Sequence, residues 1–197
     1  MAINVSKTRD MLVDVARQLF ARMGVDKTTM NDIAQASMKG RRTLYTYFKS
    51  KNEIYQAVVE TEVAKLYKML TDVSAKELPA DEKLIAFVYA RLDAVKSIVI
   101  RNGTLRANFF RDIWRVEKVR KDFDLREIDL IKRILDDGVK EGLFKMPDVN
   151  ITALVLHYAL KGLEVPYIRG VMGDTIIQRI RRRDNVVNLI FNGIKLK

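Results

Sequence analysis

The chain of 197 residues has 36 Lys and Arg against 25 Asp and Glu, a formal net charge of +11 that attracts polyanions such as DNA. It has no cysteine, which excludes a disulfide framework, a thiolate nucleophile and a cysteine-ligated zinc finger. No stretch approaches the roughly 18 apolar residues of a membrane span, and the first residues lack the pattern of a secretory signal. We therefore expect a soluble, cytoplasmic, all-helical protein with no membrane partner.

The first predicted helix spans about Thr8 to Met23. Its apolar residues recur in pairs four positions apart, which is the spacing of one helix face, and Gly24 can end it. The pairs are Met11 with Leu12, Val15 with Ala16, and Leu19 with Phe20.

Two short helices joined by a tight turn are predicted next. The first opens at Thr29, because Asp32 follows at the spacing of a capping box. Gly40 then interrupts the apolar pattern. The segment Arg41–Phe48 resumes it, with Leu44 and the final phenylalanine one turn apart and facing inward.

The outward side of this third helix is polar and basic. Two arginines, two threonines and a tyrosine there suit contacts with base edges and phosphates in a DNA groove. These residues are Arg41, Arg42, Thr43, Tyr45 and Thr46.

Residues 28–55 closely resemble the DNA-binding domain of the TetR family of bacterial regulators, and the resemblance is strong over residues 8–60. So many matches at fixed spacing are far more specific than a bare helix-turn-helix pattern. Beyond residue 60 the resemblance weakens to a helix pattern and the segment Gly138–Phe144. The matching residues are Thr28, Thr29, Asp32, Ile33, Ala34, Ala36, Thr43, Leu44, Tyr45, Tyr47, Phe48, Ser50 and Lys51, with Ala16, Leu19, Phe20 and Gly24 upstream.

The resemblance implies that the helix after the turn enters the major groove of double-stranded operator DNA. On the family's positions, Arg41 and Arg42 would divide between guanine edges and phosphates. Lys39 and Thr46 would lie near base edges. The side chains expected to hold phosphates are Thr29, Tyr45, Tyr47 and Lys51. The complete expected interface is Thr29, Lys39, Gly40, Arg41, Arg42, Thr43, Tyr45, Thr46, Tyr47 and Lys51.

Two positions depart from the family's pattern. The family usually has glycine in the turn where this chain has Met38, and Gly40 follows two positions later. It usually has a small residue where Arg42 stands, so the reading surface carries an arginine pair. The resemblance therefore leaves the geometry of the turn open, and no relative's operator sequence can be transferred to this chain.

Ser50 and Glu53 are spaced to cap a long helix over 51–73, which would connect two domains. Glycines and prolines near 103, 142–147 and 170–173 mark breaks between later helices. These are predicted at about 80–101, 104–118, 122–142, 148–169 and 174–194. We expect an all-α fold with a three-helix helix-turn-helix domain over 1–50 and a helical ligand-binding and dimerisation domain over 74–197.

The resemblance also implies a homodimer whose last two helices pair with those of its mate, and a C-terminal pocket for a small-molecule inducer. The helix at 148–169 gives independent support, because it is apolar on more than one side and so needs two partners. One stripe is Ile151, Leu154, Val155, Tyr158 and Gly162, and another is Leu156, Leu160 and Leu163.

Residue patterns that carry enzyme chemistry are missing from the sequence. There is no Walker phosphate loop, no Gly-x-Ser-x-Gly nucleophile elbow and no Glu-x-x-His pair. His157 is the only histidine, so we expect no histidine-containing metal cluster, no metal site and no cofactor. We therefore do not expect an enzyme.

His157 lies in the apolar segment ITALVLHYALKG, which leaves two interpretations open. It is a core or dimer-seam histidine with a satisfied hydrogen bond, or a polar anchor for an effector, since small-molecule pockets are apolar with few polar groups. Most aromatic residues of this half should pack in the core, while some line a cavity. The candidate effector contacts are Tyr67, Phe87, Tyr89, Arg91, Phe110, Trp114 and His157.

The leading hypothesis is a ligand-responsive transcriptional regulator, most often a repressor in this family. It would leave an inverted-repeat operator when a small, mostly apolar effector binds within residues 60–170. The alternative is a DNA-binding regulator whose C-terminal domain binds a protein partner. A large dry pocket in residues 75–197 would favour the first, and a filled core with an exposed apolar groove would favour the second.

Overall fold

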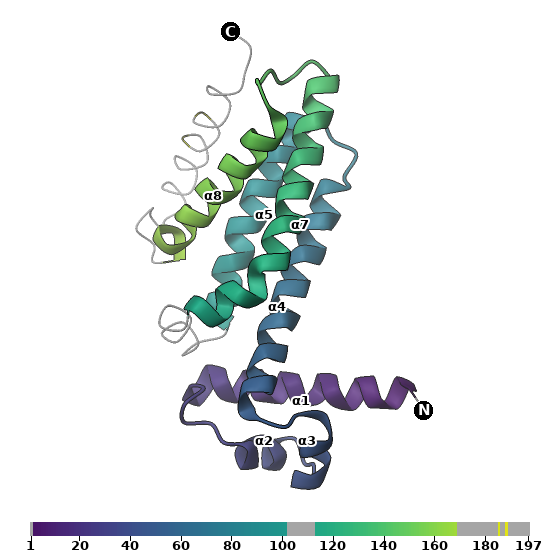
Figure 1. Cartoon of the computed structure of the whole chain (residues 1–197), viewed down its shortest axis with the longest axis vertical. Helices are drawn as coiled ribbons and strands as arrows, with labels where there is room; N and C mark the ends of the chain where they lie inside the picture. Colours follow the sequence, from purple (N-terminus) through teal and green to yellow (C-terminus); the bar gives the residue numbers. More distant parts are fainter. Residues whose placement is uncertain (1, 102–112, 169–184, 186–187, 189–197) are drawn as a thin grey trace. The chain divides into compact units, whose positions relative to one another are not determined.

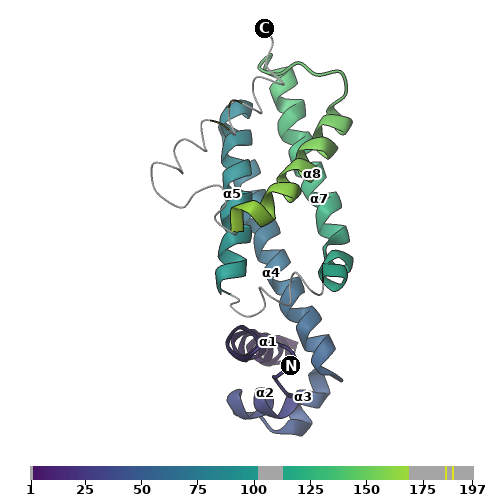
Figure 2. The same ribbon diagram turned by 90° about the vertical axis from the view of Figure 1, so that its left-hand side faces the viewer.

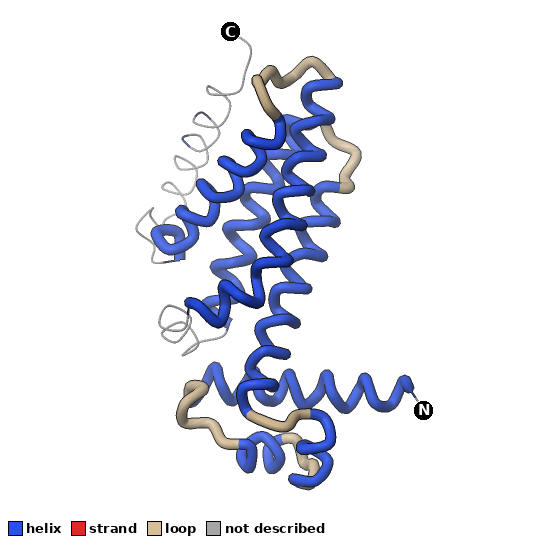
Figure 3. The backbone as a smooth tube through the Cα atoms, in the orientation of Figure 1, coloured by secondary structure: helices blue, strands red, loops and turns tan. Residues whose placement is uncertain are grey.

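The computed structural model describes residues 2–101, 113–168, 185 and 188, with side chains described over 7–98 and 121–167 and at the two single positions. The regular elements in this part of the chain are all helices, joined by loops and turns (Figure 3). The expected all-α fold is therefore confirmed. No helix among the described residues is long and apolar enough to cross a lipid bilayer.

Four helices open the chain, and α1 lies across α2, α3 and the first turns of α4 (Figure 1). They pack on one apolar core, in which Leu12, Phe20 and Ile54 have no exposed surface. The four helices are α1 (Ala2–Met23), α2 (Met30–Ala36), α3 (Arg41–Tyr47) and α4 (Lys51–Ser74).

The bounds of the first four helices match the expectation except at the N-terminus. Helix α1 begins at Ala2, well before the predicted start at Thr8. The intervening residues include no glycine or proline, so nothing there stops the helix.

Three further helices follow α4: α5 (Ala80–Arg101), α7 (Ile113–Lys140) and α8 (Val149–Ile168). Figures 1 and 2 both show α5, α7 and α8 side by side, so each can bury one face against the others. Val88 and Leu92 of α5 pack with Leu160 and Tyr167 of α8 in a buried apolar cluster.

Helix α7 runs unbroken from Ile113 to Lys140, so the predicted break between helices at 104–118 and 122–142 is wrong. The residues at that predicted break, Lys118–Asp122, include no glycine or proline, and the helix simply continues. Residues 104–112 of the first of these predictions, and the predicted last helix at 174–194, lie outside the described residues.

The segment Gly138–Phe144 closes α7. Gly142 has a φ of +70°, and the carbonyl of Gly138 accepts bonds from the backbone N–H of Leu143 and Phe144 at 2.9 and 3.0 Å. This 6→1 bond after a left-handed glycine is the pattern of a Schellman-type helix end. Phe144 folds back so closely that a Cβ built on Gly138 would lie 2.1 Å from its ring. Only glycine fits at position 138.

The chain forms two compact units. The first comprises residues 1–65 and 97–121, and the second comprises residues 66–96 and 122–197. The boundary between residues 65 and 66 lies within α4, inside the predicted connecting helix. The predicted domains over 1–50 and 74–197 follow a different division and stay a prediction.

Candidate functional site

One side of helix α3 is buried in the core of the first unit, and the opposite side is polar and exposed to solvent. Leu44 is fully buried and Phe48 nearly so, which confirms that both face inward. Arg41, Arg42 and Tyr45 are exposed on the opposite side. The expected DNA contacts that are also exposed are Thr29, Lys39, Gly40 and Thr46, while Thr43, Tyr47 and Lys51 are half-buried.

Helix α2 begins with the predicted capping box. The Thr29 hydroxyl accepts a bond from Asp32 N at 3.1 Å, and the Asp32 carboxylate accepts bonds from the hydroxyl and backbone N–H of Thr29 at 2.7 and 2.8 Å. The bonds from the Thr29 hydroxyl and backbone hold the pKa of Asp32 below its ordinary value. Any phosphate contact by Thr29 would have to share the hydroxyl with this cap.

The turn between α2 and α3 takes its left-handed residue at Met38, which has a φ of +52° and is 92% exposed. Lys39 N donates to Ala34 O at 3.1 Å and closes the end of α2. Gly40, by contrast, has an ordinary φ of −63° and serves as the N-cap of α3. Met38 therefore occupies the backbone position for which glycine is suited.

Two of the basic side chains that are expected to contact DNA already donate hydrogen bonds within the protein. Arg41 donates from Nε to Asn31 Oδ1 at 2.8 Å, and Lys51 donates from Nζ to the Asp26 carbonyl at 3.2 Å. Ser50 accepts a bond from Glu53 N at 3.2 Å and caps α4 beside Lys51, as predicted. The Arg41 guanidinium keeps its other N–H donors for a partner, since arginine has five.

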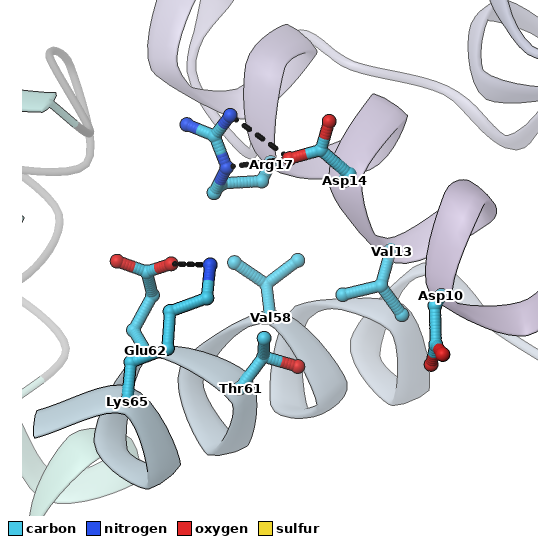
Figure 4. A pocket seen from close by; sticks show the side chains of 8 residues that line it. All are labelled: Asp10, Val13, Asp14, Arg17, Val58, Thr61, Glu62 and Lys65. Carbon is cyan, nitrogen blue, oxygen red and sulfur yellow. Dashed lines mark hydrogen bonds and ion pairs between the residues drawn. The ribbon is translucent and has the colours of Figure 1, made fainter. Parts of the chain in front are cut away.

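A cavity of about 290 Å³ lies between α1 and α4 in the first unit (Figure 4). Its charged residues include two ion pairs, Asp14 with Arg17 and Glu62 with Lys65. The cavity is lined by Asp10, Val13, Asp14, Arg17, Val58, Thr61, Glu62 and Lys65. None of the predicted effector contacts belongs to this lining.

The predicted effector contacts whose side chains the structure describes lie in the second unit, in different settings. Phe87 is fully buried in the core. Tyr67 is half-buried and packs edge-on against Phe123 at a ring distance of 6.4 Å, and Tyr89 is half-buried on α5. Phe110 and the side chain of Trp114 lie outside the described residues.

Arg91 and His157, two of the predicted polar contacts, come together in a buried charged cluster. Arg91 is fully buried on α5. Its Nε donates to Glu127 on α7, and its Nη2 donates to Glu164 Oε1 on α8 at 2.8 Å. His157 places Nδ1 3.1 Å from Oε2 of the same Glu127. Three helices of the second unit are thus joined through one arginine.

A second carboxylate of α7 faces the other side of the imidazole. Asp124 Oδ1 lies 3.7 Å from His157 Nε2, and Asp124 Oδ2 accepts a bond from Lys161 Nζ at 2.7 Å. The expectation that one histidine excludes a histidine-containing cluster was therefore wrong. A metal site takes carboxylates as readily as a second imidazole, and the fold brings Asp124, Glu127 and His157 together.

Glu127 is fully buried and remains ionised. Burial raises its pKa, but the neighbouring His157 imidazole and the charge and hydrogen bonds of Arg91 lower it by more, so the pKa of Glu127 lies below its ordinary value. A carboxylate buried in this way is stable only while its partners stay in place.

One feature of the sequence could have predicted this buried cluster. Arg91 falls on the apolar stripe of Leu84, Phe87 and Val95, at a core position of α5. Charged residues are rarely fully buried without partners. A charge at a core position therefore indicates an opposite charge on a neighbouring helix, although not which one.

The chain is similar to known regulators along most of its length. Residues 12–58 match the family described as bacterial regulatory proteins, tetR family. The HTH-type transcriptional regulator YhgD of Bacillus subtilis is 24% identical over 148 residues, which is 75% of this chain and 78% of that protein. The HTH-type transcriptional regulator QacR of Staphylococcus aureus is 21% identical over 189 residues, 94% and 97% of the two chains.

A solved structure shares the fold of nearly the whole chain. The ketosteroid transcriptional regulator KstR2 of Mycobacterium tuberculosis superposes with a TM-score of 0.62 at 20% identity. The match covers 96% of this chain and 95% of that one. The fold of this chain is therefore one that another protein also has.

Proposed function

Because the chain belongs to the TetR family of bacterial transcriptional regulators, we propose that it represses transcription from an inverted-repeat operator as a homodimer. A small, mostly apolar effector would release it, and it would act in the cytoplasm, where bacterial DNA lies. The proposal rests first on the exposed polar side of α3, which follows a capped α2 and a tight turn. That side lies within the segment that matches the family.

Arg41 and Arg42 have different parts in the proposed DNA contact. Arg41 is oriented by its bond to Asn31, so little side-chain freedom is lost when its remaining donors meet DNA. Arg42 is exposed and can reach a guanine edge, where arginine donates two bonds to O6 and N7. Lys51 and the tyrosines of α3 would hold phosphates, which carry no sequence information.

The test begins by sequencing DNA fragments that the purified protein retains. Fluorescence anisotropy with the recovered operator then compares Arg42→Ala with Lys68→Ala, which removes the same charge from a side chain that is 77% exposed on α4. Loss of a base-reading arginine should cost about 1–3 kcal/mol and relax specificity at one base pair. Equal losses for the two variants would contradict base reading by Arg42.

An exposed apolar stripe on α8 supports the proposed dimer. Ile151, Val155 and Tyr158 are 58%, 59% and 57% exposed, and Leu154 adds to the same face of the helix. Large apolar patches that remain exposed in one chain are typical of protein–protein interfaces. Two copies related by a two-fold axis would also double the DNA contacts of a reading helix that has only seven residues.

A charged residue in this stripe should separate the proposed dimer. Val155→Glu would bury a carboxylate at the seam, whereas Leu125→Glu alters a residue that is 62% exposed on α7, outside the proposed interface. Sedimentation velocity at micromolar concentration should show a dimer for wild type and Leu125→Glu, and a monomer for Val155→Glu. A monomeric wild type that binds its operator tightly would contradict the proposal.

The effector is proposed to bind within residues 60–170, among the predicted contacts. Tyr67, Phe87 and Tyr89 supply aromatic surface there, and Phe110 and Trp114 are retained as proposed contacts. The relative KstR2 is named for ketosteroids, which are largely apolar, and this supports the same class of effector here. Arg91 and His157 would interact with such a ligand only by exchanging contacts of the buried cluster.

Release requires that the effector prefer a state in which the reading helices no longer match the operator, because equal affinity for both states shifts nothing. Helix α4 is the proposed lever, since it starts at Lys51 and continues to Ser74. A tenfold loss of operator affinity requires about 1.4 kcal/mol of coupling. Trp114 is the only tryptophan, so its fluorescence can report binding of lipophilic compounds while anisotropy reports operator affinity. Ligands that bind without altering operator affinity would contradict this part of the proposal.

A further inference from the structure

The buried cluster of the second unit gathers three carboxylates from α7 and α8. Asp124, Glu127 and Glu164 are each at most 8% exposed. Arg91 contacts the two glutamates, and Lys161 contacts the aspartate. Carboxylates taken out of water are costly unless cations lie among them, so this place in the fold is suited to binding a cation.

His157 marks where that cation would lie. Its imidazole has no exposed surface, and neither ring nitrogen is aligned for a hydrogen bond with any described residue. Both nitrogens nevertheless face carboxylate oxygens, Nδ1 toward Glu127 and Nε2 toward Asp124. The imidazole is thus aimed into the cluster, with each nitrogen near a carboxylate oxygen and neither in good hydrogen-bond geometry.

We propose that Asp124, Glu127 and His157 bind a divalent transition-metal ion. Imidazole nitrogen and carboxylate oxygen are common ligands of Zn²⁺, and they also suit Mn²⁺, Co²⁺ and Ni²⁺. One ligand atom from each of the three side chains lies within 4.8 Å of the others. The site would bind the metal by itself and does not rest on the proposed function.

The backbone already places the ligands on facing helices. Asp124 and Glu127 are three residues apart on α7, so they share one face of the helix, and His157 approaches them from α8. Zinc bonds of about 2.0–2.2 Å put tetrahedral ligand atoms about 3.4 Å apart. The three ligand atoms already lie within 4.8 Å of one another, so side-chain rotations that bring them to about 3.4 Å complete the site.

Lys161 and the incoming ion compete for the same carboxylate. The Lys161 side chain is 19% exposed, so its ammonium can swing toward solvent when a metal binds Asp124. Arg91 would stay on Glu127 and orient that ligand, as partners of metal-bound carboxylates do.

The experiment titrates the full-length protein with metal alone, in the absence of DNA and effector. After treatment with chelator and its removal, ZnCl₂, MnCl₂, CoCl₂ and NiCl₂ are added in turn and binding is followed by calorimetry. We expect one ion per chain for at least one metal. At a metal concentration one hundred times Kd, the unfolding midpoint should rise by about 5–10 °C.

Four variants separate a metal site from a structural cluster. Loss of an outer partner of a metal ligand usually weakens metal binding by about 10–100-fold. His157→Gln and Asp124→Asn each remove a ligand itself, so each should weaken binding by more than this. Asp129→Asn removes an exposed carboxylate from the same helix and should bind as wild type. Lys161→Met removes the competing charge and should tighten binding at least about tenfold.

The Lys161→Met variant tests the proposal even if the ligand variants unfold. If Lys161 had only a structural role, its replacement would not tighten metal binding. Absence of saturable binding of all four metals to wild type would overturn the proposal, as would binding that neither His157→Gln nor Lys161→Met alters. Operator binding is measured in separate samples. If the protein binds its operator but no metal, the proposed function stands and the proposed metal site is wrong.

Discussion

The exposed side of α3 and the buried cluster of the second unit are built in opposite ways. The first is arranged by residues close in sequence: the Thr29 cap, the turn at Met38 and the inward anchor at Leu44. The second joins Arg91 and Glu164, which are 73 positions apart. Local chemistry thus orients a surface site, while a buried charged site exists only when three helices have packed.

The two regions also differ in how much free energy each contact carries. Ion pairs exposed to water contribute about 0–1 kcal/mol, because solvent competes for both partners. Removing one partner of a buried pair costs about 3–5 kcal/mol, because the other charge stays buried without it. The predictions below follow from this contrast, in order of decreasing effect.

Replacement of Arg91 by Met should cause the largest loss of stability. We expect Arg91→Met to lower the free energy of unfolding by about 3–5 kcal/mol, because Glu127 and Glu164 would keep buried charges with their shared cation removed. Urea denaturation followed by circular dichroism measures this. Arg133→Met is the control, since its pair with Asp129 is largely exposed, and its effect should be below about 1 kcal/mol. Similar losses for both variants would contradict the contrast.

Gly138→Ala should destabilise the end of α7 by about 1–3 kcal/mol, a typical cost of overpacking. A Cβ at this position would lie 2.1 Å from the Phe144 ring, which is itself buried. The second change Phe144→Leu should restore part of the loss by making room for the methyl group. A double variant no more stable than Gly138→Ala would show that the clash is not the cause.

Met38→Gly should stabilise the protein by about 1–2 kcal/mol. Its φ of +52° is unfavourable for any residue with a Cβ, and a side chain that is 92% exposed loses no packing when removed. The midpoint of thermal unfolding, measured without DNA, should rise. A fall would mean that the methionine side chain stabilises the turn in a way that its exposure does not reveal.

Thr29→Ala should cost about 0.5–2 kcal/mol through loss of the α2 cap. Because the pKa of Asp32 is lowered in the folded protein, the stability that its charge contributes is present above its unfolded pKa, about 3.9. That contribution is lost as the pH falls through the lower folded value. Unfolding curves between pH 7 and pH 3 should therefore bring wild type and variant closer together at the acid end. Thr46→Ala, on the exposed side of α3, is the control and should stay within about 0.5 kcal/mol of wild type.

The sequence predicted most of the first unit because its signals act over a few residues. The spacing of Thr29 with Asp32 and of Ser50 with Glu53 located two helix starts, and the inward positions of Leu44 and Phe48 followed from helical period. The position of the left-handed residue did not follow, because Met38 is a poor residue for it and Gly40, the better one, is not used there.

The second unit was predicted less well, for a physical reason. Glycine and proline located the bounds of α5 and α8 correctly. The break predicted within α7 had neither residue to support it and was wrong. The cluster around His157 depends on which faces of α5, α7 and α8 meet. Helical periodicity indicates that Arg91 and Glu127 lie on the core faces of their helices. That they contact each other and His157 depends on how the helices pack, which periodicity does not predict.

The charged cluster also determines how α8 can slide along α7. An all-apolar seam would tolerate a shift of one helical turn, about 5.4 Å, because Leu and Val pack acceptably against many neighbours. The same shift here would carry His157, Lys161 and Glu164 past their partners on the other two helices. Every intermediate position would then hold a misaligned buried charge. We therefore expect α8 to have a single register on α7, so that movement of the second unit proceeds by rotation of these helices as a group rather than by slippage between them.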